Sequence, residues 1–286
     1  MADNPAEPFF IRVGPDVPAS PVVLSVPHAG RDYSPRLLRA SRLPREKLEV
    51  LEDRLVDRLV WRAAASGCTT LVARRPRAEI DLNRDPREIE PHTVTPALSP
   101  RTILQSPRTR SGLGLVPSRI SGAGSIWLHP MDQSELRRRI EEVHEPYHAA
   151  VAAALAAARD TFGVAVLLDC HSMPPRGSGE PPIVFGDRHG TSIAPHLRDA
   201  AVGAAEATGY AWSVNTPYAG GYVTARHGRP AANIHAIQLE IDRSAYLDPT
   251  LREPGPGFDA AAMLVAAIAE ALAECALGQP QAIAAE

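Results

Sequence analysis

Side chains that can bind metals or transfer protons follow apolar runs at several places in the sequence. His28 ends the run PVVLSVPHAG, His171 ends VAVLLDCHS, and Glu240 lies late in IHAIQLEID. Asn83 and Arg84 follow the shorter run AEIDL. In open α/β sheets, ligands collect at the carboxyl ends of the strands. We therefore expect these residues to converge at one edge of one sheet.

Two histidines and a carboxylate would supply the three protein ligands of a catalytic zinc site, with a fourth position left for water. A separate carboxylate would then take the proton from that water. Glu52 and Asp53, in the helical segment after the His28 loop, are both candidates for the third ligand. The sequence has no HExxH motif and has 10 histidines, so spacing alone is weak support for a metal site.

Alternation along the VAVLLDCHS strand separates the roles of three consecutive residues. Asp169 and His171 share one face, while Cys170 points to the other. A Cys–His nucleophilic pair is therefore not expected, and Cys170 is interpreted as a small buried hydrophobe. The best functional role for Asp169 is support of a metal ligand.

Seven further histidines are interpreted as surface or loop residues, although His227 is kept as a possible neighbour of a substrate. Tyr147 and His148, in the motif EPYH, are expected on a helix and are more typical of packing than of chemistry. The residues covered by this interpretation are His129, His144, His148, His189, His196, His227 and His235.

Strands and helices must alternate to position these residues. β-branched and apolar runs predict strands in PVVLSVPHAG, TTLVARR, AEIDLNRDP, VAVLLDCHS, PPIVFGD and IHAIQLEID, the second and third of which could form a hairpin. The segment NTPYAGGYVTARHGRP is predicted to be a loop or hairpin.

Leucine spacing predicts a helix through PREKLEVLEDRLVDRLVWRAAASG, because Leu48, Leu51, Leu55 and Leu59 recur at helical intervals up to a stop at Gly67. A long helix is predicted from Ser134 to about Arg159, with SELR as a cap signal at its start. Further helices are predicted in SIAPHLRDAAVGAAEATGY, which ends at Gly209, and in the tail.

The fold class follows from this order of elements. Continuous apolar strands that alternate with helices indicate an α/β fold with a mostly parallel, mixed sheet and helices on both faces. No internal repeat or linker separates independent halves, so a single domain is expected over residues 1–286. Residues 91–130 are rich in Pro, Ser, Gly and Thr, and a loop of that length is usually functional or mobile.

Charge and cysteine content narrow the classes of function. Lys plus Arg total 30 against 33 for Asp plus Glu, which argues against a nucleic-acid partner. Lys47 is the single lysine, so arginine must bind any substrate carboxylate. The 3 cysteines are widely separated and form no CxxC pair, so neither a disulfide framework nor a thiolate zinc site is indicated. No signal peptide or membrane span is indicated, and a cytoplasmic location is expected.

Eight short motifs, in order, carry a resemblance to a known family. They are SVPHAG, EDRLVDRLV, EIDLNRDP, GLGLVP, EPYHAA, LLDCHSMP, PYAGGYVTARHG and HAIQLEIDRSAYLD. Together they resemble the N-formylglutamate amidohydrolase family from about Pro21 to Asp248. The resemblance implies a three-layer, phosphorylase/hydrolase-like fold similar to that of the zinc carboxypeptidases.

The resemblance also implies roles for individual residues. It assigns one zinc ion per chain to His28, Asp53 and His171, with Asp53 preferred to Glu52 although helix phase leaves both open. Glu240 takes the place of the general base that acts on the zinc-bound water.

Substrate-binding residues are implied in the same way. Asn83 and Arg84 resemble a pair that grips a substrate carboxylate, although Arg84 could instead pair with Asp81 or Asp85. The resemblance and the neighbouring residues add Tyr218, Gly220, Gly221, Arg226 and Arg243 as substrate-binding candidates.

The activity implied by the resemblance is hydrolysis of the N-formyl or N-acyl amide of an acidic amino acid, most simply N-formyl-L-glutamate, with a role in histidine degradation. Arg243 could serve a second substrate carboxylate or a different acyl amino acid. Two alternatives stay open at this point: a carboxypeptidase-like metallopeptidase, and a non-catalytic relative that binds a metal or ligand. The sequence leaves the oligomeric state undetermined.

Overall fold

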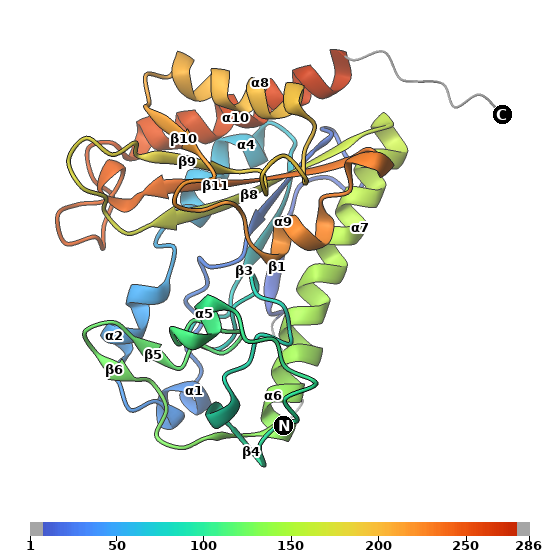
Figure 1. Ribbon diagram of the computed structural model, residues 1–286. Coiled ribbons are helices and arrows are strands. Elements are labelled where there is room, and N and C mark those ends of the chain that lie inside the picture. The colour runs from blue at the N-terminus through green and yellow to red at the C-terminus, as the bar shows by residue number, and fades with distance from the viewer. Residues whose placement is uncertain (1–7, 279–286) are drawn as a thin grey trace, which may run out of the picture. The chain divides into compact units, whose positions relative to one another are not determined.

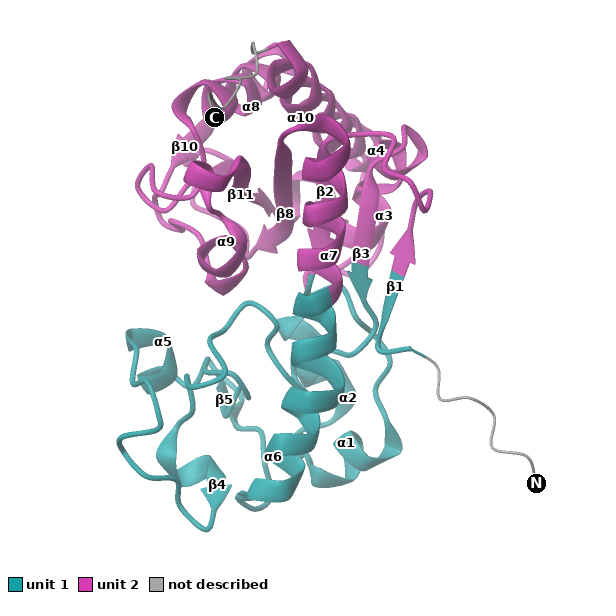
Figure 2. Cartoon of the chain, turned by 90° about the vertical axis from the view of Figure 1, so that its right-hand side faces the viewer, with its two compact units in different colours: residues 1–11, 27–52, 72–149 teal, residues 12–26, 53–71, 150–286 magenta. Residues whose placement is uncertain are grey.

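The computed structural model describes residues 8–278, which divide into two compact units coloured separately in Figure 2. Unit 1 comprises residues 1–11, 27–52 and 72–149, and unit 2 comprises residues 12–26, 53–71 and 150–286. Stretches of the two units alternate in the sequence, so no single boundary separates them. The single domain expected over residues 1–286 stays a prediction.

A seven-stranded sheet, most of whose residues belong to unit 2, has the order β1-β3-β2-β8-β11-β9-β10. Strand β2 pairs with β8, β8 with β11, and β9 with β10, each in parallel, whereas β9 and β11 are antiparallel. The mostly parallel, mixed sheet is thereby confirmed. Its strands are β1 (Phe10–Val13), β2 (Val22–Val26), β3 (Thr69–Ala73), β8 (Ala165–Met173), β9 (Ile183–Gly186), β10 (Trp212–Val214) and β11 (Ile234–Asp242).

The central strands are buried along their whole length, as their apolar sequences predict. Every residue of β2, β8 and β11 is buried. The register places Ser25 of β2 beside Asp169 of β8, and Glu240 of β11 beside His171 of β8. The sheet itself therefore brings the polar ends of three strands together.

Helices pack on both sides of this sheet in unit 2. Helices α8 (Pro195–Ala207) and α10 (Phe258–Gly278) pack against each other and lie above the sheet in Figure 1. Helix α9 (Tyr222–His227) contacts β8 and β11 and lies below them. The predicted α/β layers are confirmed. Residues 215–230 were expected to be a loop or hairpin but contain α9. This helix has only six residues, which is too short to give a helical periodicity in the sequence.

Helix α10 is the one helix among residues 8–278 that is long and apolar enough to cross a membrane. It contacts α8, β8 and β2, as well as α4 (Trp61–Ala65). Leu264, Val265 and Ile268 are fully buried in these contacts. The same composition and packing are typical of the core helix of a soluble domain, so one such helix is weak support for a membrane span.

The predicted continuous helix over residues 44–67 is wrong. The chain forms α2 (Arg45–Leu48) and η1 (Glu49–Leu51), becomes extended at Glu52, and resumes with α3 (Val56–Leu59) and α4. The four leucines that suggested the helix are all buried, so their spacing was a correct sign of burial. The break comes from tertiary contacts of residues 53 and 54, described below.

The long helix predicted from Ser134 is confirmed, with three components. It comprises α6 (Gln133–Arg139), the π-helical turn η3 (Ile140–His144) and α7 (Glu145–Phe162). The N-cap is Asp132, whose side chain accepts a hydrogen bond from the backbone N–H of Ser134 at 2.7 Å. The cap predicted at Ser134 is therefore wrong, because an aspartate two residues earlier satisfies this N–H.

The rest of unit 1 is largely irregular. Residues 79–84 form buried turns, so the strand or hairpin predicted for AEIDLNRDP is wrong. The segment 91–130 is mostly loop, as its composition predicts. The short elements of unit 1 are α1 (Pro35–Ala40), η2 (Pro91–Thr93), β4 (Val94–Thr95), α5 (Pro107–Arg110), β5 (Arg119–Ile120), β6 (Gly124–Ser125) and β7 (Met131–Asp132).

Candidate functional site

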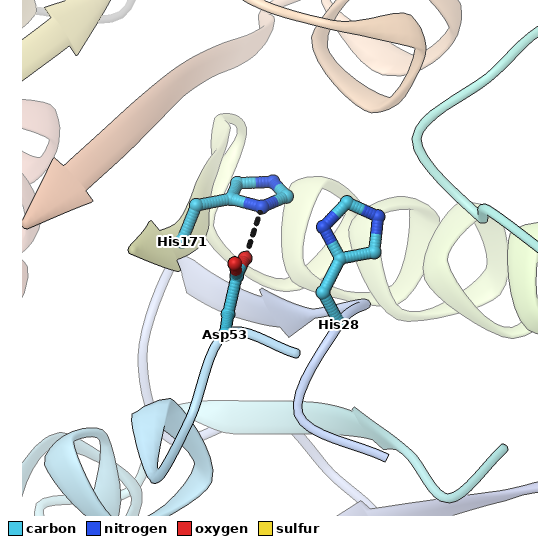
Figure 3. Close-up of side chains that lie close together, drawn as sticks. All are labelled: His28, Asp53 and His171. Carbon is cyan, nitrogen blue, oxygen red and sulfur yellow. Dashed lines mark hydrogen bonds and ion pairs between the residues drawn. The ribbon is translucent and has the colours of Figure 1, made fainter. Parts of the chain in front are cut away.

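His28, Asp53 and His171 form a group that could hold a metal ion. Each offers one ligand atom, these atoms lie within 4.8 Å of one another, and all three residues are buried (Figure 3). Ligand atoms around a tetrahedral zinc ion stand about 3.3 Å apart, given metal–ligand distances near 2.0 Å. The two-nitrogen, one-oxygen donor set therefore fits a catalytic zinc site, and the 4.8 Å limit admits this separation.

The ring of His171 is held between two carboxylates. Its Nδ1 lies 2.9 Å from Asp53 Oδ2, and its Nε2 lies 2.9 Å from Asp169 Oδ2. Asp169 also accepts a hydrogen bond from Ser25 Oγ at 2.8 Å. Burial alone would lower the pKa of His171, but Asp169 and Asp53 raise it well above its usual value. An aspartate on Nε2 would leave Nδ1 as the atom available to a metal ion.

His28 is backed in the same way by Asp81. His28 Nε2 lies 2.7 Å from Asp81 Oδ1, and the Asp81 side chain is fully buried. Burial would raise the pKa of Asp81, but Arg77, Arg84 and His28 lower it well below its usual range, so it is ionised. The sequence offered only a pairing of Asp81 with Arg84. The one sequence feature that could have indicated this role of Asp81 is its position in an apolar run, two residues before Asn83.

Asp53 owes its position to the break between η1 and α3. Asp53 Oδ1 lies 3.3 Å from Arg243 Nη2, and the carbonyl of Arg54 accepts a hydrogen bond from Tyr246 Oη at 2.6 Å. Leu55 then adopts φ 62° before the helix resumes. These tertiary contacts override the local preference for a helix that the leucine spacing indicates, so the helix is interrupted at Asp53.

Glu52, the other candidate for the third ligand, has a different partner. Its Oε1 accepts a hydrogen bond from Tyr33 Oη at 2.7 Å. Burial, followed by the charge of Glu52, raises the pKa of Tyr33 above its usual value, so the phenol stays a donor. The structure thus places Asp53 with the two histidines and engages Glu52 elsewhere.

Glu240 stands beside His171 on the neighbouring strand, and Gln238 Nε2 donates a hydrogen bond to Glu240 Oε1 at 2.8 Å. Both side chains face the same side of β11, as alternation predicts. A carboxylate in this position can accept a proton from a water molecule near the His171 ring.

Arg84 is a buried arginine with one uncommitted nitrogen. Its Nε donates to the carbonyl of Leu113 and its Nη1 to the carbonyl of Asn83. Its Nη2 is buried, lies 3.7 Å from Asp81 Oδ2, and has no hydrogen-bond partner among residues 8–278. Burial lowers the pKa of Arg84 to about 10, so it remains a cation that can bind a carboxylate.

The other predicted substrate-binding residues lie in and around α9. Tyr218, Gly220 and Gly221 precede the helix. Gly220 has φ 112°, and its backbone packs closely on Gly186: a Cβ added to Gly186 would lie 2.6 Å from the nitrogen of Gly220. Arg226 is exposed and donates to Tyr222 Oη at 2.9 Å. Arg243 is buried against Ser172 and Asp53. Their roles toward a substrate stay predictions.

Four histidines expected at the surface or in loops are buried: His144, His148, His227 and His235. For His227, burial and then Arg226 lower the pKa to about 4. His129, His189 and His196 are exposed, as expected. Cys170 is buried, and burial raises the pKa of its thiol well above its usual value, which agrees with a structural role.

A group of two histidines and an aspartate that could hold a metal, with a glutamate in register beside one histidine, is typical of metal-dependent hydrolases. The family model for N-formylglutamate amidohydrolase matches residues 20–247, and the chain belongs to this family. It is therefore an enzyme of the amidohydrolase class, as the motifs implied.

Individual relatives agree with this assignment. The chain is 33% identical to N-formylglutamate deformylases of Pseudomonas putida, over 80% of this chain and 83% of that protein, and of Pseudomonas aeruginosa, over 80% and 82%. The crystal structure of N-formylglutamate amidohydrolase from Ralstonia eutropha JMP134 is similar, with a TM-score of 0.83 and 32% identity. That match covers 91% of this chain and 97% of the other.

Proposed function

We propose that this enzyme hydrolyses N-formyl-L-glutamate to formate and L-glutamate with one zinc ion per chain. The observation that carries the proposal is the buried group of His28, Asp53 and His171, with Glu240 in register beside it. The names of the relatives supply the substrate, and the donor set supplies the choice of metal.

The three grouped residues would hold the ion through His28 Nδ1, His171 Nδ1 and an Asp53 oxygen. When bound, zinc acts as a Lewis acid toward the formyl oxygen and lowers the pKa of a water molecule. Asp81 and Asp169 keep the proton of each ring on Nε2, so that Nδ1 presents its lone pair.

Glu240 serves as the general base. It takes a proton from the water that attacks the formyl carbon and delivers this proton to the amide nitrogen. The C–O bond to the water oxygen forms, and the C–N bond breaks. The water supplies the oxygen of formate, and the amine leaves as L-glutamate. Gln238 restrains the carboxylate through its 2.8 Å hydrogen bond.

Arg84 and Asn83 bind one substrate carboxylate. The buried Nη2 of Arg84 is the donor whose position favours this role, because a buried cationic N–H is costly unless an acceptor reaches it. Asp81 contacts both Arg84 and His28, so the carboxylate grip and one metal ligand share a partner within unit 1. A location in the cytoplasm and a role in histidine degradation stay predictions.

A substrate panel tests the proposal. The zinc content of the purified enzyme is measured by mass spectrometry. Hydrolysis is then measured as formate or acid release with N-formyl-L-glutamate, N-formyl-L-aspartate, N-acetyl-L-glutamate and N-formyl-L-leucine, and as cleavage of a peptide with a free C-terminus. We expect about one zinc per chain and the highest kcat/KM for N-formyl-L-glutamate. Full activity in a protein freed of metal, or a preference for the peptide, would contradict the proposal.

A further inference from the structure

One face of the helix formed by α6, η3 and the start of α7 binds the backbone of the segment 79–84. Arg139 Nη1 donates to the carbonyl of Glu79 at 2.6 Å. His148 Nε2 lies 2.9 Å from the carbonyl oxygen of Leu82, and His144 Nε2 lies 2.9 Å from that of Arg84. Because a carbonyl can only accept, each histidine must carry its proton on Nε2 and donate it.

The π-helical turn aligns these donors. The backbone N–H of Glu145 bonds to the carbonyl of Ile140, five residues earlier. In an unbroken α-helix, two residues five apart point about 140° away from each other. The wider turn brings Arg139 and His144 toward the same side, and His148 follows one α-helical turn later. Such turns occur frequently at functional sites.

The segment 79–84 contains residues proposed for the site but forms no helix or strand of its own. It contains Asp81, which backs His28, and the Asn83–Arg84 pair. Elsewhere in the segment, Arg84 Nε donates to the carbonyl of Leu113 at 2.8 Å, and the Asp81 N–H donates to that of Leu115 at 2.7 Å. Its conformation therefore depends on donors from outside the segment.

We propose that His144 and His148 are positioning residues, which fix the carboxylate grip of Arg84 by binding the backbone of the segment 79–84. The inference rests on the proposed function only for the identity of the carboxylate that Arg84 binds. The two rings contact each other, with centroids 4.5 Å apart, and both are buried at 1% and 0% exposure. Two buried imidazoles that each bind a carbonyl are costly as mere filling, for which leucine would suffice.

Amide hydrogen exchange tests the positioning directly and requires no turnover. His144→Leu and His148→Leu remove the donor at similar volume, whereas His144→Gln and His148→Gln retain an N–H near the Nε2 position. We expect exchange at the Asp81 and Asn83 amides to speed up about tenfold in the leucine variants, and to return to within about threefold of wild type in the glutamine variants. His235→Leu, at a buried histidine of unit 2, is the matched control and should leave these amides unchanged.

Kinetics with the zinc-loaded enzyme provide the second readout. For N-formyl-L-glutamate, His144→Leu should raise KM about tenfold and change kcat less than about threefold, because the carboxylate grip is loosened while the metal and base remain. In an Arg84→Met background the same substitution should change KM less than about twofold.

A failure of this inference can be distinguished from a failure of the proposed function. If N-formyl-L-glutamate is not hydrolysed, the proposed substrate is wrong, and the exchange experiment still decides the positioning role. Unchanged exchange in the leucine variants would overturn the inference. So would glutamine variants as impaired as the leucine variants, or exchange that rises equally throughout the chain. If a leucine variant fails to fold, the glutamine variant decides: a rise of more than about threefold in exchange at the Asp81 and Asn83 amides would overturn the inference.

Discussion

Glu240 on β11 lies directly opposite His171 on β8 in a parallel register. Two residues earlier, Gln238 lies opposite Asp169 in the same register. Each strand thus carries one residue proposed for the chemistry and one that orients it, through the 2.8 Å bond from Gln238 to Glu240 and the 2.9 Å contact between Asp169 and His171. The spacing between base and ligand is consequently set by the sheet.

Replacing the proposed base should abolish activity without loss of metal. Glu240→Gln keeps the shape of the side chain but cannot accept a proton, so kcat should fall by about 10²- to 10⁴-fold. Zinc content and the thermal unfolding midpoint should stay close to wild type, whereas His171→Ala should lose zinc as well. Measured zinc and formate release decide the matter, and an active Glu240→Gln enzyme would exclude the assigned base.

The aspartates behind the histidines should tune the affinity for zinc. Asp81→Asn and Asp169→Asn remove the carboxylates that fix the ring tautomers, and each should weaken zinc binding by about 10- to 100-fold. Competition with a fluorescent chelator measures the effect. Asp187→Asn, at a buried aspartate whose partner is Asn215, is the control and should bind zinc like wild type. Equal affinities in all three variants would contradict the role assigned to Asp81 and Asp169.

Arg84 should affect substrate affinity more than the chemical step. Arg84→Met removes the cation, and we expect KM for N-formyl-L-glutamate to rise by about 10- to 100-fold, as is typical for a lost charge-assisted hydrogen bond. Steady-state kinetics on the zinc-loaded protein provide the measurement. Arg226→Met, at the exposed arginine on α9, is the comparison. A larger effect at Arg226 than at Arg84 would reverse the assignment.

Arg243 offers a test between two roles. Its contacts with Asp53 and Ser172 favour support of the metal ligand, whereas the sequence suggested a grip on a second carboxylate. We expect Arg243→Met to weaken zinc affinity about tenfold, with KM unchanged once zinc is saturating. A raised KM at full zinc occupancy would instead favour the substrate role.

An acid-sensitive contribution to stability should come from Glu135. Burial alone would raise its pKa, but hydrogen bonds from Arg138 and Arg139 lower it from 4.5 to about 2. The ionised form therefore stabilises the fold above about pH 4.5, and this contribution is lost as the pH falls toward 2.

Glu135→Gln should accordingly reduce the free energy of unfolding by about 1 to 2 kcal/mol at neutral pH, after allowance for solvent screening. The difference from wild type should shrink between pH 4.5 and pH 3. Urea unfolding at several pH values measures it, with Glu141→Gln, at an exposed position of the same helix, as the control. A difference that is constant with pH would contradict the assignment.

Apolar runs were sufficient to predict the strands that matter most. The segments that became β2, β8 and β11 are continuous apolar runs, because both faces of the sheet are covered. The polar residues at their ends, His28, His171 and Glu240, could thus be predicted to converge. The motifs then supplied Asp53, which periodicity had left equal with Glu52.

Long-range contacts account for what the sequence could not provide. Asp81 lies 53 positions from His28, and no local pattern pairs them. His144 and His148 reach carbonyls 60 and 66 positions away, because a π-helical turn rotates the helix. A backbone carbonyl has no signature in the residue letters, so partners of this kind become visible only in three dimensions.

The interruption of the helix at Asp53 has a consequence for when the proposed metal site can form. Leu48, Leu51, Leu55 and Leu59 favour a continuous helix, yet Leu55 occupies a left-handed conformation that costs about 1 to 2 kcal/mol. A continuous helix through this point would remove the extended residue and the left-handed residue that flank Asp53. Local preference and native structure are therefore frustrated here. If the proposed zinc ion binds this group, Asp53 is in place as a ligand only once this segment has folded, so binding would accompany or follow folding.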